Sequence, residues 1–149
     1  MSSFKIFNGL TKKELSRIFD VGVIQQVEEG KILFHKGDSG SDMYAVLTGK
    51  IGIVTESGGK KEVIAELGPG ELFGEVAMFG EAHQRSAGAV AREFSQVLTL
   101  SEETFKKMVE SKVPKRFLIN LVRMLSERLL DMHARYSRAV SGEKHEMGK

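Results

Sequence analysis

The spacing of hydrophobic residues changes twice along the chain of 149 residues. Near the N-terminus, Leu15, Ile18 and Phe19 recur at helical spacing and form one apolar face. The segment before them, "TKKE" at residues 11–14, is a capping-box pattern, in which a threonine and a glutamate satisfy each other's backbone amides. Together these features predict a short helix that ends near Gly22.

From residue 23 to residue 100 the period shortens, and β-branched or aromatic runs alternate with glycine-rich turns. Ile51 and Ile53 alternate with small or polar neighbours, which places both isoleucines on one face of a strand. The segment 56–61, "ESGGKK", predicts an exposed hairpin loop, and 67–74, "LGPGELFG", is too rich in Gly and Pro for a central strand. The 16 glycines against two prolines fit many tight turns. We therefore expect an all-β sandwich, roll or barrel.

Helical spacing returns after the strands. Ser101 is a candidate N-cap, followed by two glutamates, and it opens a predicted helix through Met108. Pro114 suits the first position of a second, longer helix, which we expect to continue to Val140. The residues of this helix that step by three and four, the spacing of a coiled-coil seam, are Leu118, Val122, Leu125, Leu129, Met132 and Tyr136.

The pattern divides the chain into a strand-rich domain with short flanking helices (1–113), the long helix (114–140) and a polar tail (141–149) that we expect to fray. The long helix should lie on its own domain first and then pair with a partner, because its first half carries a second apolar set. The alternative is one long helix packed against a single domain. The second set consists of Phe117, Leu121 and Met124.

Composition removes several classes of function. The chain has no cysteine, which excludes a disulfide scaffold, a thiolate zinc site, a cysteine nucleophile and a cysteine-ligated iron–sulfur cluster. A net charge of +2 gives no argument for nucleic-acid binding. No segment approaches the roughly 20 apolar residues of a membrane span, so we expect a cytoplasmic protein without a membrane partner. Neither a nucleophile–base arrangement nor metal-ligand spacing is evident, so no enzyme, metal or cofactor is predicted.

The segment 70–91, "GELFGEVAMFGEAHQRSAGAVA", places charged residues in apolar surroundings. Buried charge is costly unless it is paired, so two interpretations remain open. Glu75 and Arg85 could pair with each other, or a ligand with both hydroxyls and negative charge could lie between them. Arginine presents a planar fork of donors that matches phosphate. Ser86 adds a hydroxyl beside it, and Gly74 lets backbone approach a ligand closely.

This segment resembles the phosphate-binding cassette of the cyclic-nucleotide-binding domain family, which includes catabolite activator proteins, kinase regulatory subunits and gated channels. The glycine-punctuated strands upstream resemble the β-roll of the same family. The resemblance implies a mainly β fold, a jelly-roll-like β-roll with flanking helices and a long C-terminal helix. Many relatives have proline before the arginine, where this chain has Gln84, a mild departure. The residues that match the cassette are Phe73, Gly74, Glu75, Val76, Ala77, Arg85, Ser86 and Ala87.

The resemblance also implies roles. Arg85 would pair with the cyclic phosphate, Glu75 would accept from the ribose 2′-hydroxyl, and Ser86 would bond the phosphate or the purine. The backbone at Gly74 and Ala77 would face the ribose–phosphate.

Ile53 and Val76 would form the apolar wall around the base. In relatives the long helix covers the purine. The candidates for that contact in this chain are Arg128, Met132, His133 and Tyr136.

We therefore expect a non-enzymatic sensor of 3′,5′-cyclic AMP or cyclic GMP, with cyclic AMP placed first, although no residue distinguishes the two bases. It would signal through its C-terminal helix to an unknown partner chain and would form a homodimer through that helix. The alternatives are a degenerate fold that serves as a dimerisation scaffold, or a truncated transcription regulator. About nine residues follow Val140, too few for a helix-turn-helix, so no DNA binding is expected. His83, a lone candidate metal or haem ligand, is expected to be a loop residue.

Overall fold

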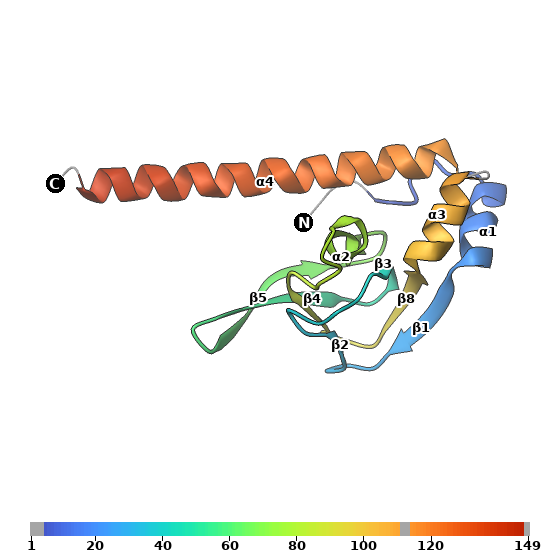
Figure 1. Cartoon of the computed structure of the whole chain (residues 1–149), viewed down its shortest axis with the longest axis horizontal. Helices are drawn as coiled ribbons and strands as arrows, with labels where there is room; N and C mark the ends of the chain where they lie inside the picture. Colours follow the sequence, from blue (N-terminus) through green and yellow to red (C-terminus); the bar gives the residue numbers. More distant parts are fainter. Residues whose placement is uncertain (1–4, 111–113, 148–149) are drawn as a thin grey trace.

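The computed structural model describes residues 5–110 and 114–147, with backbone alone for 142–147. In chain order the elements are α1 (Lys12–Val21), β1 (Val23–Val27), β2 (Ile32–Phe34), β3 (Met43–Thr48), β4 (Ile51–Ser57), β5 (Lys60–Leu67), β6 (Leu72–Phe73), α2 (Glu75–Phe79), β7 (Gly88–Ala91), β8 (Ser95–Leu100), α3 (Glu102–Glu110) and α4 (Lys115–Met147). Figure 1 shows a roll of strands with the short helices α1 and α3 at one end, α2 near its middle and one long helix across the top.

The strands form two four-stranded antiparallel sheets, in the orders β1-β8-β3-β6 and β2-β7-β4-β5. The predicted all-β architecture is therefore confirmed. The hairpin turn between β4 and β5 falls at Gly58 and Gly59, inside the predicted loop, and both glycines have positive φ. β6 contains only Leu72 and Phe73 and lies at a sheet edge, as expected for its Gly/Pro-rich surroundings.

Two apolar cores share the β3–β8 sheet because side chains alternate along its strands. On β3, Tyr44 and Val46 face the second sheet, whereas Met43 and Ala45 face the helices. The first half of α4 covers this outer face, as the second apolar set predicted. The members of that set, Phe117, Leu121 and Met124, are all buried in the helix-side core.

The short helices begin as the sequence predicts. Thr11 and Glu14 form a full capping box at the start of α1, and Gly22 follows its last residue. The Ser101 hydroxyl accepts a hydrogen bond from the Thr104 amide at 3.1 Å at the start of α3. The cassette also contains a short helix, α2, that was not predicted.

At the end of α2, Met78 is buried whereas Phe79 is half exposed. The length predicted for the long helix was wrong. The long helix does not end at Val140 but continues to Met147, so the expected frayed tail is helical up to that residue. The segment 141–147 lacks proline, and its one glycine costs a helix only about 1 kcal/mol, too little to stop a helix already running. Residues 148–149 lie outside the described residues.

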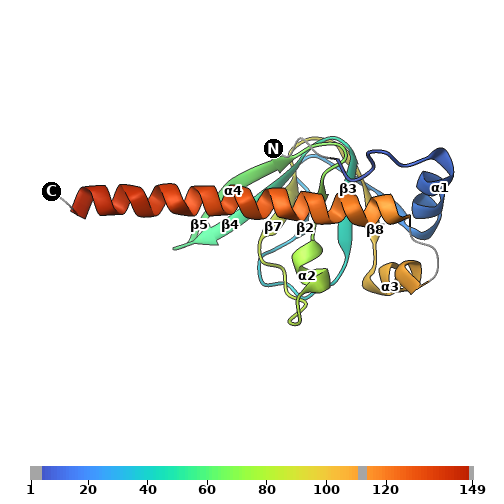
Figure 2. The same cartoon turned by 90° about the horizontal axis from the view of Figure 1, so that it is seen from above.

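Beyond the roll, α4 projects away from the sheets in both views (Figures 1 and 2). Its 33 residues correspond to roughly 50 Å of helix. Four of the six predicted seam residues, Val122, Leu129, Met132 and Tyr136, are more than 60% exposed. Among the described residues, no helix is long and apolar enough to cross a membrane.

Candidate functional site

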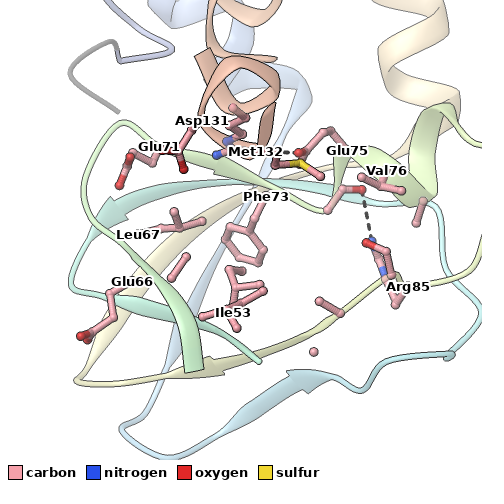
Figure 3. Close-up of a pocket in the computed structure, with 18 of the residues that line it drawn as sticks. Ile53, Glu66, Leu67, Glu71, Phe73, Glu75, Val76, Arg85, Asp131 and Met132 are labelled. Carbon is pink, nitrogen blue, oxygen red and sulfur yellow. Dashed lines mark hydrogen bonds and ion pairs between the residues drawn. The ribbon is translucent and has the colours of Figure 1, made fainter. Parts of the chain in front are cut away.

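A pocket of about 530 Å³ lies between the β4–β5 sheet, the cassette and α4 (Figure 3). It brings together side chains from both sheets and from the long helix. All eight residues first proposed for ligand binding line it. These are Ile53, Gly74, Glu75, Val76, Ala77, Arg85, Ser86 and Ala87.

Arg85 lies buried at one end of this pocket, with only 5% of its surface exposed. Its Nη1 donates to the backbone carbonyl of Asp42 at 2.8 Å and to that of Gly74 at 3.3 Å. Its side chain makes no other hydrogen bond to the described residues, so the N–H groups of Nε and Nη2 can still donate to a ligand. No described acidic side chain forms an ion pair with it. A buried guanidinium with free donors beside a cavity is suited to an anion.

Gly74 makes the approach of Arg85 to the backbone possible. It has φ +82°, in the left-handed region that favours glycine. An added Cβ would lie 2.9 Å from the Asp42 carbonyl oxygen and 3.1 Å from Nη1 of Arg85. Any larger residue at position 74 would therefore both strain the backbone and push against the guanidinium.

Glu75 is not paired with Arg85, so the structure removes one of the two interpretations left open by the sequence. Its Oε1 accepts from Nη1 of Arg128, on α4, at 2.7 Å. The second terminal nitrogen of Arg128 donates to the Leu72 carbonyl. Oε2 of Glu75 has no hydrogen bond within the described residues and remains an acceptor. Figure 3 draws Glu75 beside α4 and Arg85 on a separate wall of the pocket.

Helix geometry decides which of the four α4 candidates reach the pocket. Arg128 and Met132 line it, but His133 and Tyr136 do not. His133 is rotated by about 100° from Met132 and therefore points away from the pocket. Tyr136 is only about 40° from Met132 but lies on the side away from Asp131 and Arg135, and it does not line the pocket. Tyr136 is 69% exposed and is not positioned to cover a base in this arrangement.

Sequence reasoning missed several lining residues. Phe34, on β2, contacts the guanidinium of Arg85, and its only signal was its place in an apolar run before a glycine turn. Asp131 and Arg135 also line the pocket and pair with each other at 3.1 Å. They are one helical turn apart on the face that carries Arg128. A periodic search for charged residues along that face would have found them.

Two neighbours of Arg85 support the cassette from outside the pocket. His83 has φ +49°, and its Nδ1 lies 2.9 Å from the Ala77 carbonyl oxygen and 3.4 Å from Oε2 of Glu102. It is thus a loop residue that links α2 to α3, and no described cluster of His, Asp and Glu could hold a metal ion.

Tyr44 lies on the other side of the cassette boundary, on β3, with its ring 5.6 Å from Cζ of Arg85. Burial raises the pKa of the Tyr44 hydroxyl, an effect that the charge of Arg85 opposes.

Comparison with known proteins points to one family. A model of the cyclic nucleotide-binding domain matches residues 24–112, more than half of the chain. The chain is similar to a cyclic AMP receptor protein from Thermus thermophilus, with 35% identity over 130 residues that cover 87% of this chain and 59% of that protein. A cGMP-dependent protein kinase from Caenorhabditis briggsae is 30% identical over 112 residues, which cover 73% of this chain and 15% of the kinase. The chain thus spans about three-fifths of the length of the first relative.

Among solved structures, the chain is similar to the catabolite activator protein of Thermus thermophilus. The TM-score is 0.78 at 32% identity, with 89% of this chain and 61% of that chain covered. The likeness extends over the roll and the long helix together. It confirms the fold class predicted from the sequence and the family resemblance of the cassette.

Proposed function

The chain belongs to the cyclic nucleotide-binding domain family, and from that premise we propose that it is a non-enzymatic sensor of a 3′,5′-cyclic nucleotide. The cyclic phosphate binds at Arg85 and the ribose 2′-hydroxyl donates to Glu75. We place cyclic AMP before cyclic GMP because the relative with 35% identity is named a cyclic AMP receptor, although the kinase relative is named for cyclic GMP.

The buried state of Arg85 is the observation that carries this proposal. Arg85 is 95% buried and has lost most of its hydration, yet only one nitrogen of its guanidinium is hydrogen-bonded within the described residues. Leaving buried charged donors unsatisfied is unfavourable. A phosphodiester carries one negative charge and two free oxygens, so it can satisfy Nε and Nη2 without adding excess charge.

The sugar end supplies the link to α4. Arg128 fixes Oε1 of Glu75 and leaves Oε2 for a ligand hydroxyl, so the ligand and the helix use the same carboxylate. A ligand changes a conformation only when it binds two states with different affinity. We propose that this difference arises at Glu75, because its orientation depends on where α4 lies.

The exposed seam of α4 offers the route by which the signal leaves the chain. Leu129, Met132 and Tyr136 are each about two-thirds exposed and lie at coiled-coil spacing on α4. We propose that this seam pairs with the same seam of a second copy, and that the dimer passes the signal to a downstream protein.

Titration calorimetry of the full chain with 3′,5′-cyclic AMP and with cyclic GMP tests the proposal. We expect 1:1 binding of at least one of them at micromolar concentration, weakened at least tenfold with 5′-AMP, whose open phosphate lacks the cyclic geometry. Hydrogen exchange of α4 with and without ligand then tests the coupling. Absence of heat up to millimolar concentration of both cyclic nucleotides would leave only the scaffold alternative.

A further inference from the structure

The segment that connects β2 to β3 lies against Arg85 over much of its length, although it is outside the cassette motif. The Arg85 amide donates to the Asp38 carbonyl at 2.8 Å, and the Arg85 carbonyl accepts from the Gly37 amide at 2.8 Å. The Asp42 carbonyl, at the end of the same segment, accepts from Nη1. Both the backbone and the side chain of Arg85 are therefore fixed by residues 34–42.

Phe34 supplies the platform under the guanidinium. Cζ of Arg85 lies 4.2 Å from the centroid of the Phe34 ring and 5.6 Å from that of Tyr44. A register shift between Ile32 and Phe34 on β2 turns Phe34 inward, where its ring also packs against Phe73 at 6.2 Å. A cation over an aromatic face is attracted to it, most strongly when both are shielded from water.

Gly40 lies beside the same guanidinium, next to Nε and Nη2. A Cβ at position 40 would be 2.9 Å from both Nε and Nη2, the two nitrogens that make no hydrogen bond within the described residues. Gly40 does not have positive φ, so its backbone does not require glycine. Glycine is needed here because a side chain would occupy the space of Arg85. Gly40 is not one of the residues that line the pocket.

We propose that Phe34 and Gly40 are positioning residues for Arg85: the aromatic ring holds the guanidinium, and the absent side chain of Gly40 leaves Nε and Nη2 open to the incoming anion. The role in binding rests on the proposed function, whereas the role in placing the guanidinium does not. The ring restricts the plane of the fork, and the absent side chain keeps its free edge open. Part of the proposed phosphate site is thus built by a segment that the cassette motif does not include.

Gly40→Ala is the cleanest test. Alanine tolerates the backbone of position 40, and the added methyl group meets the far end of a flexible side chain, so the fold should persist while the guanidinium is displaced. Gly68→Ala is the matched control, because its Cβ would meet nothing within 4 Å and its φ is not positive. We expect Gly40→Ala to weaken cyclic nucleotide binding roughly tenfold or more and Gly68→Ala to leave it within twofold.

Phe34→Leu and Phe34→Tyr separate the ring from apolar volume. The leucine variant should weaken binding roughly tenfold, and the tyrosine variant, which keeps the ring, should bind within threefold of wild type. Thermal unfolding identifies any variant that fails to fold, and Gly40→Ala then carries the test alone. Affinities of Gly40→Ala and Phe34→Leu equal to that of wild type would overturn the role in binding.

NMR of the ligand-free protein provides a readout that needs no ligand. The Nε–H proton of Arg85, assigned by its loss in Arg85→Lys, should be shifted upfield by the Phe34 ring in wild type and in Phe34→Tyr. It should move to the position of an exposed arginine in Phe34→Leu and Gly40→Ala. An unchanged signal in both variants would overturn the proposal. If wild type binds neither nucleotide, the proposed function fails, but this measurement still decides whether Phe34 and Gly40 hold the guanidinium.

Discussion

The two ends of the pocket hold their charged residues in different ways. Arg85 rests on the carbonyls of Asp42 and Gly74 and on the ring of Phe34, all of which belong to the roll. Glu75 bonds instead to Arg128, which comes from the long helix. The end that we assign to phosphate is therefore complete within the roll, whereas the end that we assign to sugar is shared between the roll and α4.

Under the proposed function, this difference would separate affinity from signalling. A group bound at Arg85 gains its interactions wherever α4 lies, so it contributes affinity to every state of the helix. A group bound at Glu75 depends on the contact with Arg128, so its free energy differs between states of the helix. Only the second kind of interaction can shift a conformational equilibrium. The variants below test each end by itself.

Removing the phosphate end should have the largest effect. Arg85→Ala deletes a charge-assisted interaction at a buried site, and we expect cyclic nucleotide affinity to fall roughly 100-fold or more, about 3 kcal/mol. Arg17→Ala, at an exposed arginine on α1, should bind like wild type. Calorimetry at one fixed salt concentration measures both. Affinity of Arg85→Ala within threefold of wild type would show that the phosphate does not bind at this residue.

Disrupting the seam should separate assembly from binding. Leu129→Glu places a charge at the centre of the exposed seam, and we expect self-association to weaken roughly tenfold or more. Leu130→Glu is the matched control, because Leu130 is equally exposed, at 69% against 67%, but lies off the seam. Sedimentation equilibrium measures self-association, and binding at the Arg85 end should stay within threefold. Equal dissociation by both variants would contradict pairing through the seam.

The features that the sequence predicted well are local ones. The capping box of α1, the shared face of Ile51 and Ile53 on β4 and the composition of the cassette depend on residues close together in the chain. Glu75 and Arg85 line the same pocket, as the spacing of the cassette predicted. Their partners could not be read from the sequence, because Asp42 and Arg128 lie 43 and 53 residues away from the residues that they bond.

The packing of α4 decides which of the four candidates on this helix line the pocket. The resemblance placed the base contact on one stretch of the helix, but the choice within that stretch depends on where the helix packs. Arg128 and Met132 face the pocket, and His133 and Tyr136 do not. The buried residue Met124 fixes this rotation through the core of the roll, which no local pattern reveals.

Separating Arg128 from Glu75 should change the affinity for cyclic AMP less than the preference for cyclic AMP over 2′-deoxy cyclic AMP. We expect Arg128→Ala to weaken cyclic AMP binding roughly three- to tenfold, because the partly buried pair orients Glu75 but is not the phosphate contact. In wild type, 2′-deoxy cyclic AMP should bind more weakly than cyclic AMP, and this ratio should shrink in Arg128→Ala. In Arg17→Ala the ratio should stay unchanged. A ratio that Arg128→Ala does not alter would show that the sugar end is independent of α4.

The smallest expected effect concerns Glu102 on α3, which contacts His83 of the cassette loop and Lys106 of its own helix. The hydrogen bond from Lys106 lowers the pKa of the Glu102 carboxyl, and the nearby His83 lowers it further. A carboxyl whose pKa is lower in the folded state adds stability above its ordinary value of 4.5, and this stability is lost as the pH falls below it. We expect Glu102→Gln to lower the urea midpoint slightly at pH 7 and to match wild type near pH 3. Glu103→Gln, at an 80% exposed side chain on the same helix, should show a smaller difference at pH 7. A difference between Glu102→Gln and wild type that persists unchanged at pH 3 would mean that packing, rather than the charge of Glu102, links the cassette to α3.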